Sequence, residues 1–311
     1  MSDIEALDDK SVARLVPTRD PAAHKGDNGI LVVVAGSLDY LGAALLATSA
    51  ATRAGAGLVC LAVPASLQPL VAGGVVEAIT LGLTETSPGE VEPAGALAQI
   101  VERKPDALVV GPGLRAGVAT VALVASIVSG QGAPAVIDAE ALNSLAGRPE
   151  WWAVGRQLVL TPHAGEFARL DGSPVGPDDG ERATRAAAAA RRWGRVVVLK
   201  GARTVIAAPD GRIARSPFAV AALATAGTGD VLAGTIGALL AQGMDPYDAA
   251  RLGVYLHGAA GAAIAERLGD AGLVASDLPP AIARVRRDLA TVRDRLEGGR
   301  RLGFADRVRE A

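Results

Sequence analysis

The stretch Ala226-Gly227-Thr228-Gly229-Asp230 stands directly before an apolar helical pattern, Val231–Gln242. Glycines at the start of a helix let the backbone approach an anion closely, and the first N–H groups and the helix dipole then favour negative charge. Asp230 alone could be an ordinary helix N-cap. An N-cap does not account for the two glycines and the threonine ahead of it. The stretch therefore predicts an anion site that includes Asp230.

Short apolar runs alternate with longer helical patterns around this stretch. The runs are continuous rather than alternating, as expected for parallel strands covered on both faces. This order predicts an α/β fold, a single domain with a mainly parallel central sheet flanked by helices on both faces. The expected strands are Ile30–Ala35, Leu58–Val63, Ala107–Val110, Ala135–Ile137, Leu158–Leu160, Val196–Leu199 and Thr204–Ala207, all parallel, and the expected helices are Ala43–Ala54, Val118–Val128, Asp178–Trp193, Val231–Gln242 and Pro246–Arg267.

The composition excludes several classes of protein. The 311 residues carry 31 basic and 33 acidic side chains, and this balance argues against a nucleic-acid partner. The single cysteine, Cys60, excludes a disulfide framework and a thiolate metal cluster. The N-terminus lacks the apolar segment of a secretory signal, and the apolar run Ala219–Gly243 has a charge, Asp230, near its centre. We therefore expect a cytoplasmic protein with no membrane and no nucleic acid as partner.

The end of the chain differs in composition from the rest. Residues 281–311 are rich in arginine, and we interpret them as a helical tail with a solvated amphipathic helix rather than as a specific anion site. We expect residues 1–23 to form a lead-in and residues 24–280 to form the α/β domain.

Three polar segments follow apolar strands, at the sheet edge where α/β folds bind ligands. Lys200 ends one strand, and its ammonium suits a phosphate, although such a lysine can also simply reach solvent. His163 and Glu166 follow another strand; a carboxylate beside phosphates often holds Mg²⁺, but the same spacing is that of a helix capping box. Asp138 ends a third strand and could hold a metal or polarise a hydroxyl.

The segment Gly111-Pro112-Gly113-Leu114-Arg115 partly fits the G-x-G-x-x-[GA] dinucleotide fingerprint. That interpretation would make the protein a dehydrogenase. Pro112 and the better anion site at Gly227–Asp230 instead favour a loop that a ligand approaches closely. His257 lies in an apolar helical pattern, and we interpret it as a core or helix-packing histidine.

Taken in order, these segments resemble one family, the NAD(P)H-hydrate dehydratases of the ribokinase-like superfamily. The resemblance runs from about His24 to Leu278. Three positions depart from the usual family pattern, namely Arg115, Glu140 and Ala164. The matching motifs are H-K-G-D-x-G, G-S-x-x-Y-x-G-A, G-P-G-L, D-A-E-A-L-N, T-P-H-x-G-E, L-K-G-x-x-T, G-T-G-D-V-L-A-G and L-H-G.

The resemblance implies a ribokinase-like fold and a hydro-lyase that repairs damaged NADH and NADPH. The enzyme would dehydrate the S form of NADHX or NADPHX at the expense of ADP, giving AMP and phosphate, or of ATP, with Mg²⁺ as cofactor. Phosphorylation of the hydrate's hydroxyl would make a good leaving group. The other epimer would need a separate epimerase, because the chain begins only about two dozen residues before His24. The resemblance also implies a homo-oligomer, a tetramer.

The resemblance also assigns roles to individual residues. Asp230 would be the catalytic base, with the Gly227–Gly229 backbone as the anion hole. The nucleotide-binding residues would be Lys200, Gly201, Ala202, Arg203, Thr204, Gly227, Thr228 and Gly229; the hydrate-binding residues would be Ala43, Gly113, His163 and Asp230; and the magnesium ligands would be Glu166 and Asp138.

Two other functions share these motifs. A small-molecule kinase for a vitamin precursor alcohol, of the hydroxymethylpyrimidine or thiazole type, would use the same G-T-G-D site. A nucleotide-sensing module without catalysis would not need both Asp230 and Lys200. The sequence does not decide between ADP and ATP, although the lone domain and the preference for arginine over lysine favour ADP.

Overall fold

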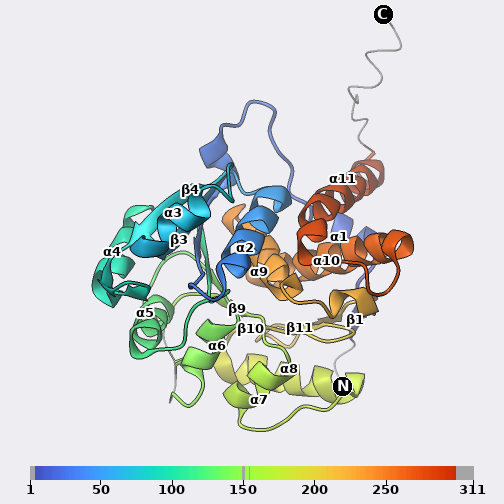
Figure 1. Ribbon diagram of the computed structural model, residues 1–311. Coiled ribbons are helices and arrows are strands. Elements are labelled where there is room, and N and C mark those ends of the chain that lie inside the picture. The colour runs from blue at the N-terminus through green and yellow to red at the C-terminus, as the bar shows by residue number, and fades with distance from the viewer. Residues whose placement is uncertain (1–3, 149–150, 154, 299–311) are drawn as a thin grey trace, which may run out of the picture.

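The computed structural model describes residues 4–148, 151–153 and 155–298. Within them one ten-stranded sheet forms the centre of the molecule, in the order β1-β12-β11-β10-β9-β8-β7-β2-β3-β4 (Figure 1). The strands are β1 Glu5–Ala6, β2 Ile30–Val34, β3 Leu58–Pro64, β4 Ile79–Leu83, β7 Ala107–Val110, β8 Ala135–Ile137, β9 Leu158–Leu160, β10 Val196–Leu199, β11 Val205–Ala207 and β12 Ile213–Arg215, with a separate hairpin of β5 Glu85–Ser87 and β6 Glu90–Val91.

The sheet is mainly parallel, as predicted, with one correction. Strand β11 pairs antiparallel with β10 and with β12, whereas the sequence analysis predicted Thr204–Ala207 as a parallel strand. The physical reason is the short link between β10 and β11, residues 200–204. A parallel neighbour needs a crossover of a dozen or more residues.

Helices cover both faces of this sheet (Figure 1). On one face α2, α9, α10, α11 and α1 pack together, and on the other α4, α5, α6, α7 and α8 pack. The helices are α1 Asp9–Ala13, α2 Leu41–Ala54, α3 Gln68–Ala72, α4 Pro93–Glu102, α5 Val118–Ser129, α6 Glu140–Leu145, α7 Ala164–Asp171, α8 Asp179–Trp193, α9 Thr228–Ala241, α10 Pro246–Leu268 and α11 Leu278–Leu296. None of the helices in the described ranges could span a lipid bilayer.

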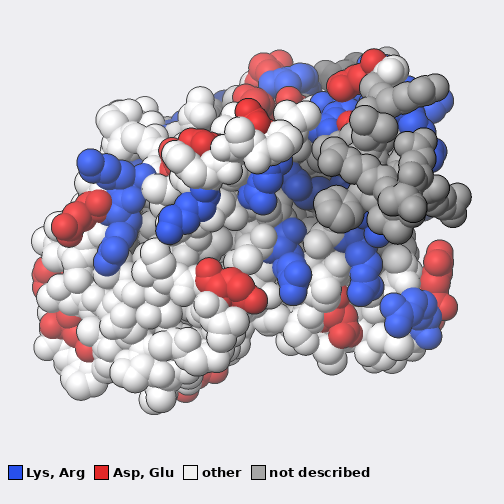
Figure 2. Space-filling view, turned by 90° about the horizontal axis from the view of Figure 1, so that it is seen from above, with Lys and Arg blue, Asp and Glu red and all other residues white. Residues whose placement is uncertain are grey.

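The arginine-rich helix is more closely attached than a solvated tail. Helix α11 begins at Leu278 and packs against α10 and α2. Arg293 is only 3% exposed and donates to the carbonyl oxygen of Val16 at 2.7 Å. Basic and acidic side chains are interspersed on the face of the molecule seen in Figure 2. Residues 299–311 of the predicted tail lie outside the described residues.

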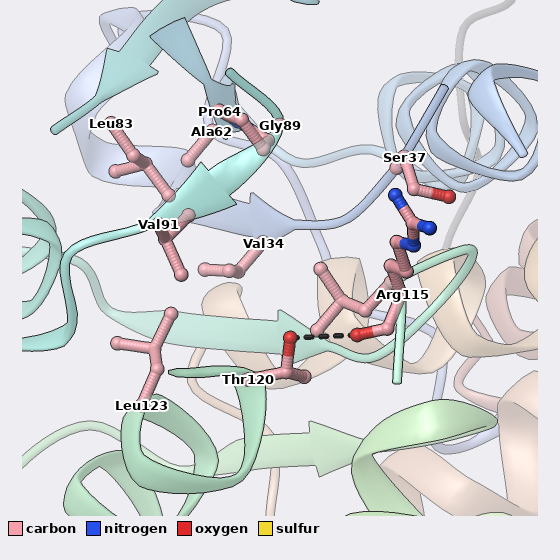
Figure 3. A pocket seen from close by; sticks show the side chains of 12 residues that line it. Val34, Ser37, Ala62, Pro64, Leu83, Gly89, Val91, Arg115, Thr120 and Leu123 are labelled. Atoms are coloured by element: carbon pink, nitrogen blue, oxygen red, sulfur yellow. Dashed lines mark hydrogen bonds between the residues drawn. The ribbon is translucent and has the colours of Figure 1, made fainter. Parts of the chain in front are cut away.

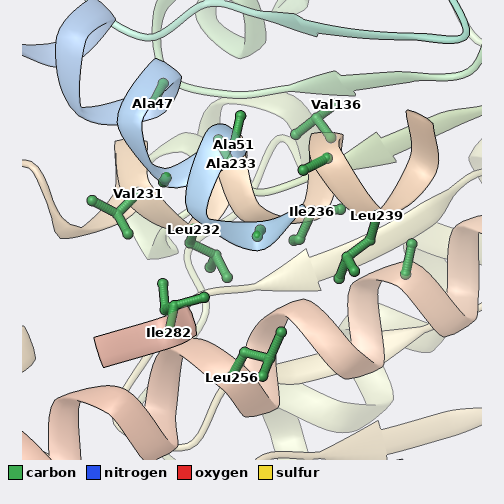
Figure 4. Close-up of a cluster of buried hydrophobic side chains, with 14 of the residues drawn as sticks. Ala47, Ala51, Val136, Val231, Leu232, Ala233, Ile236, Leu239, Leu256 and Ile282 are labelled. Atoms are coloured by element: carbon green, nitrogen blue, oxygen red, sulfur yellow. The ribbon is translucent and has the colours of Figure 1, made fainter. Parts of the chain in front are cut away.

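Small residues bring α2 and α9 into backbone contact. A Cβ added at Gly234 of α9 would lie 2.1 Å from the carbonyl oxygen of Ala47 of α2. One added at Gly237 would lie 2.2 Å from a methyl group of Val109 in β7. The buried cluster around this contact is drawn in Figure 4. Helix α9 is therefore fixed against both α2 and the sheet, so its first turn has a defined position.

Candidate active site

Helix α9 begins without a side-chain cap. Its N-cap is Gly227, with φ +88°, and no side chain accepts from the first-turn N–H groups. A Cβ at Gly227 would lie 2.6 Å from a methyl group of Leu46 in α2, so glycine is required by both conformation and space. Asp230 lies in the first turn and is not the N-cap. The first turn of α9 therefore has N–H groups without a side-chain acceptor, and the anion site at this turn stays a prediction.

A lysine and two carboxylates meet beside this turn. Lys200 Nζ lies 2.7 Å from Asp138 Oδ1 and 3.8 Å from Glu166 Oε2. The Lys200 N–H also donates to the Pro162 carbonyl oxygen at 2.8 Å, which aligns the end of β10 with the start of α7. Burial alone would lower the pKa of Lys200, but the carboxylates of Asp138 and Glu166 outweigh it and raise the pKa. The lysine is therefore a permanent cation at the centre of the site.

Asp138 is held in place by a strained turn. It is 1% exposed and accepts from Thr161 Oγ1 at 2.8 Å. Ala139, the next residue, has φ +49°, which a residue with a side chain rarely adopts. A Cβ at Gly111 would lie 1.8 Å from the carbonyl oxygen of Asp138, so β7 and β8 end in tight contact. Such strain is often found at functional sites.

Asp230 lies in the field of this cluster. Burial raises its pKa first, and the carboxylates of Asp138 and Glu166 raise it further, while Lys200 opposes them. The resulting pKa is about 7. A carboxylate with that pKa is matched to taking up a proton near neutral pH.

The His163–Glu166 segment forms the capping box that the sequence analysis kept as an alternative. His163 Nδ1 accepts from the N–H groups of Gly165 at 3.0 Å and Glu166 at 3.3 Å. In return Glu166 Oε2 accepts from the His163 N–H at 2.8 Å. This box begins α7 and fixes Glu166 beside Lys200. Both residues therefore have a structural role, whatever they do for a ligand.

A cavity of about 680 Å³ opens beside the first turn of α9. Its volume is suited to a nucleotide-sized ligand. Of the predicted site residues, those that line it are Lys200, Gly201, Ala202, Thr204, Thr228, Gly229 and His163. Arg203, Gly227 and Asp230 are not among its lining residues, and Arg203 Nη1 lies 3.4 Å from Asp179 Oδ2 in an ion pair.

His257 lies at the wall of this cavity, and the sequence analysis missed it as a site residue. Its Nε2 is 2.9 Å from the Thr228 carbonyl oxygen, and because a carbonyl only accepts, Nε2 carries the proton. Burial lowers the pKa of His257 to about 4, so the ring is neutral near pH 7. It holds the turn that begins α9. The L-H-G motif was the available signal.

Ala43 and Gly113 also come together. A Cβ at Gly113, whose φ is +64°, would lie 2.9 Å from the Ala43 Cβ and 2.5 Å from the Tyr40 carbonyl oxygen. Because Gly227 contacts Leu46 on the same helix, this pair and the first turn of α9 lie at the same end of α2. Ala43 and Gly113 are not among the residues that line the large cavity, whereas His163 is.

Comparison with known proteins identifies the class to which this fold and site belong. A family model described as NAD(P)H-hydrate dehydratase matches residues 31–284, and the chain belongs to that family. Among solved structures, a ribokinase-like superfamily protein from Enterococcus faecalis has the same fold, with a TM-score of 0.76 at 23% identity over 93% of this chain and 98% of that chain. The predicted ribokinase-like fold is therefore confirmed.

Two individual relatives of this chain have names that state an activity. The chain is 38% identical to the ADP-dependent (S)-NAD(P)H-hydrate dehydratase of Xanthomonas campestris, over 86% of this chain and 92% of that protein. It is 44% identical to a bifunctional NAD(P)H-hydrate repair enzyme of Moorella thermoacetica, over 88% of this chain and 52% of that protein. The chain therefore spans about half the length of such bifunctional relatives.

A solved structure adds ligand information about a relative. The ADP/ATP-dependent NAD(P)H-hydrate dehydratase of Bacillus subtilis, co-crystallised with ATP and Mg²⁺, superposes with a TM-score of 0.79 at 32% identity. The match covers 93% of this chain and 100% of that chain.

The residues beside Lys200 are compatible with Mg²⁺ on a nucleotide. Within the described ranges no group of three or more His, Cys, Asp or Glu side chains forms a metal site by itself. Mg²⁺ needs no such cage, since it usually takes one or two carboxylates and completes its shell with water and phosphate oxygens. Each carboxylate has one oxygen already engaged, because Asp138 Oδ1 bonds Lys200 and Thr161 and Glu166 Oε2 accepts from the His163 N–H.

Proposed function

We propose that this protein is an ADP-dependent (S)-NAD(P)H-hydrate dehydratase, a hydro-lyase that restores NADH and NADPH from their S hydrates. The observation that carries the proposal is Asp230, a carboxylate with a pKa of about 7 in the uncapped first turn of α9. The family membership and the named relatives support the same activity.

In the proposed mechanism, each group of site residues binds one substrate, and Asp230 acts between the two. ADP lies in the large cavity, with its phosphates toward Lys200 and the first-turn N–H groups of α9. The hydrate lies on the Ala43 and Gly113 side, and Asp230 takes the proton from its hydroxyl as that oxygen attacks the terminal phosphorus of ADP. AMP leaves, and the phosphorylated hydrate then loses phosphate from one ring carbon and a proton from the neighbouring carbon to solvent, which restores the dihydronicotinamide double bond. A general base of this kind contributes about 10²–10⁴-fold.

Magnesium has a limited place in this proposal. We propose Glu166 and Asp138 as the residues that would hold Mg²⁺. When bound, the ion would neutralise charge on the phosphate oxygens. A separate epimerase, a tetrameric assembly and a cytoplasmic location stay predictions.

The test is a repair assay. The purified protein is mixed with (S)-NADHX and Mg²⁺, with ADP in one series and ATP in the other, and absorbance is followed at the NADH band. We expect recovery of NADH, faster with ADP. No recovery with either nucleotide would overturn the proposal, and a thiazole alcohol with ATP serves as the control for the kinase alternative.

A further inference from the structure

A second cavity lies at the carboxyl ends of β2, β3 and β7, close to Gly113. Its volume is about 20 Å³, which is roughly the space for one water molecule. Most of its wall is apolar, and its polar side chains are Ser37, Arg115 and Thr120 (Figure 3). The cavity is too small for a ring of the substrate but large enough for a single oxygen atom.

The hydroxyl of Ser37 lacks a partner. Ser37 is 3% exposed, and its Oγ makes no hydrogen bond within the described part of the chain. A buried polar group left in this state is unfavourable and is rare in native proteins. An oxygen from a ligand would satisfy it.

Arg115 lies at the mouth of the same cavity and points toward Ser37 (Figure 3). Among the described residues its guanidinium has no acidic partner, unlike that of Arg203. Its backbone is fixed, because Thr120 Oγ1 donates to the Arg115 carbonyl oxygen at 2.7 Å. A guanidinium is a planar fork that matches phosphate oxygens.

Arg115 and Ser37 lie next to Gly113 and the start of α2, where we place the hydrate. Arg115 follows Gly113 by two residues, and Ser37 precedes the start of α2, whose N-cap, Tyr40, makes no side-chain cap bond. We propose that Arg115 and Ser37 form a phosphate subsite for the dinucleotide hydrate. The phosphate binds at the cavity mouth on Arg115 and directs one oxygen to the Ser37 hydroxyl. This inference rests on the proposed function.

Two phosphates of the substrate have the required chemistry. The bridging pyrophosphate is present in both NADHX and NADPHX, whereas the 2′-phosphate is present only in NADPHX. The experiment measures kcat and KM of Arg115→Gln for each hydrate at saturating ADP. We expect a KM about tenfold higher with kcat nearly unchanged. A rise for both hydrates identifies the pyrophosphate, and a rise for NADPHX alone identifies the 2′-phosphate. Unchanged KM for both overturns the subsite.

Three further variants separate the subsite from general effects on the fold. Ser37→Ala should raise the same KM without lowering thermal stability, because the hydroxyl has no partner to lose. Arg115→Lys keeps the charge but not the fork, so its KM should lie between those of the wild type and Arg115→Gln. Arg267→Ala, at an exposed arginine near the end of α10, should leave both KM values unchanged.

A binding measurement keeps this inference separate from the proposed function. Calorimetric titration of wild type and Arg115→Gln with NADPHX and, separately, with NADHX, both without ADP, reports affinity even where turnover is absent. No turnover by the wild type contradicts the proposed function alone. Equal affinity of the two proteins for NADPHX and for NADHX contradicts the subsite alone.

Discussion

Helices α7 and α9 both begin beside Lys200, but they begin differently. At α7 the side chains of His163 and Glu166 satisfy the first-turn N–H groups and the N-cap N–H reciprocally. At α9 the N-cap is Gly227, and no side chain caps the turn. The sequence predicts a ligand-binding segment at the start of each helix, but only the N-terminus of α7 is capped by side chains. No side chain accepts from the first-turn N–H groups of α9, and this difference favours α9 over α7 as the place of the proposed phosphate.

The carboxylates of the two helices differ in the same way. Glu166 Oε2 is 2.8 Å from the His163 N–H, so this carboxylate is fixed by its own helix. Asp230 makes no hydrogen bond within the described residues, and burial raises its pKa to about 7. The fixed carboxylate is suited to positioning, and the other is suited to proton transfer.

Lys200 lies beside the first turns of both α7 and α9, so its substitution should lower the stability of the protein more than the other substitutions do. In Lys200→Met the buried carboxylate of Asp138 loses its cation, and breaking a buried pair costs about 3–5 kcal/mol. We expect the lower end of this range in chemical denaturation, because 18% of the Lys200 side chain is exposed. ADP affinity measured by calorimetry should also fall. The double variant Lys200→Met/Asp138→Asn should regain stability but not ADP affinity; if it regains both, Lys200 has no role toward phosphate.

Asp230 should limit the stability of the protein at neutral and higher pH. Its folded pKa is raised from 3.8 to about 7, so the folded state binds more protons between these values and loses stability as pH rises through them. Asp230→Asn removes this loss. We expect the variant to be more stable than wild type at pH 8 by about 2 kcal/mol, and at most about 4, with no gain below pH 4. An equal gain at both pH values would mean that titration of Asp230 is not the cause.

Substitution of His163 in the capping box of α7 should change the stability of the protein least. His163→Ala removes the acceptor of two N–H groups and should destabilise the protein by about 1 kcal/mol. His163→Asn can cap in its place and should restore most of that stability. If His163 also binds the hydrate, as predicted, KM for NADHX rises in both variants. If KM recovers with stability in His163→Asn, the role of His163 is to cap the helix.

Much of the fold could be predicted because its signals are local. Strands β7, β8, β9 and β10 have the predicted boundaries, since each is a continuous apolar run that ends at a polar or glycine residue. Strand β4 was missed, because it lies at the sheet edge, contains Gly82 and exposes Ile79. Helix α6 was missed because it is only one or two turns long and depends on packing, and α7 was expected only through the capping-box alternative at His163 and Glu166.

The candidate site could be predicted only in part. At Gly227–Asp230 the local sequence was sufficient to predict where α9 begins to within a turn, because the glycine at its N-cap is a local signal. The pair of Lys200 and Asp138 joins positions 62 residues apart, and the contact of His257 with Thr228 joins two helices. No local pattern encodes such contacts. The choice between ligand and capping box at His163 likewise needed coordinates.

The most direct test of the central claim is turnover by Asp230→Asn, measured beside its affinity for ADP. The wild type and the variant receive (S)-NADHX, Mg²⁺ and ADP under the same conditions, and ADP binding is measured by calorimetry. We predict that kcat falls about 10²–10⁴-fold while ADP affinity changes little, because we propose Asp230 as the base and it does not line the cavity in which we place ADP. Turnover at the wild-type rate would contradict the account.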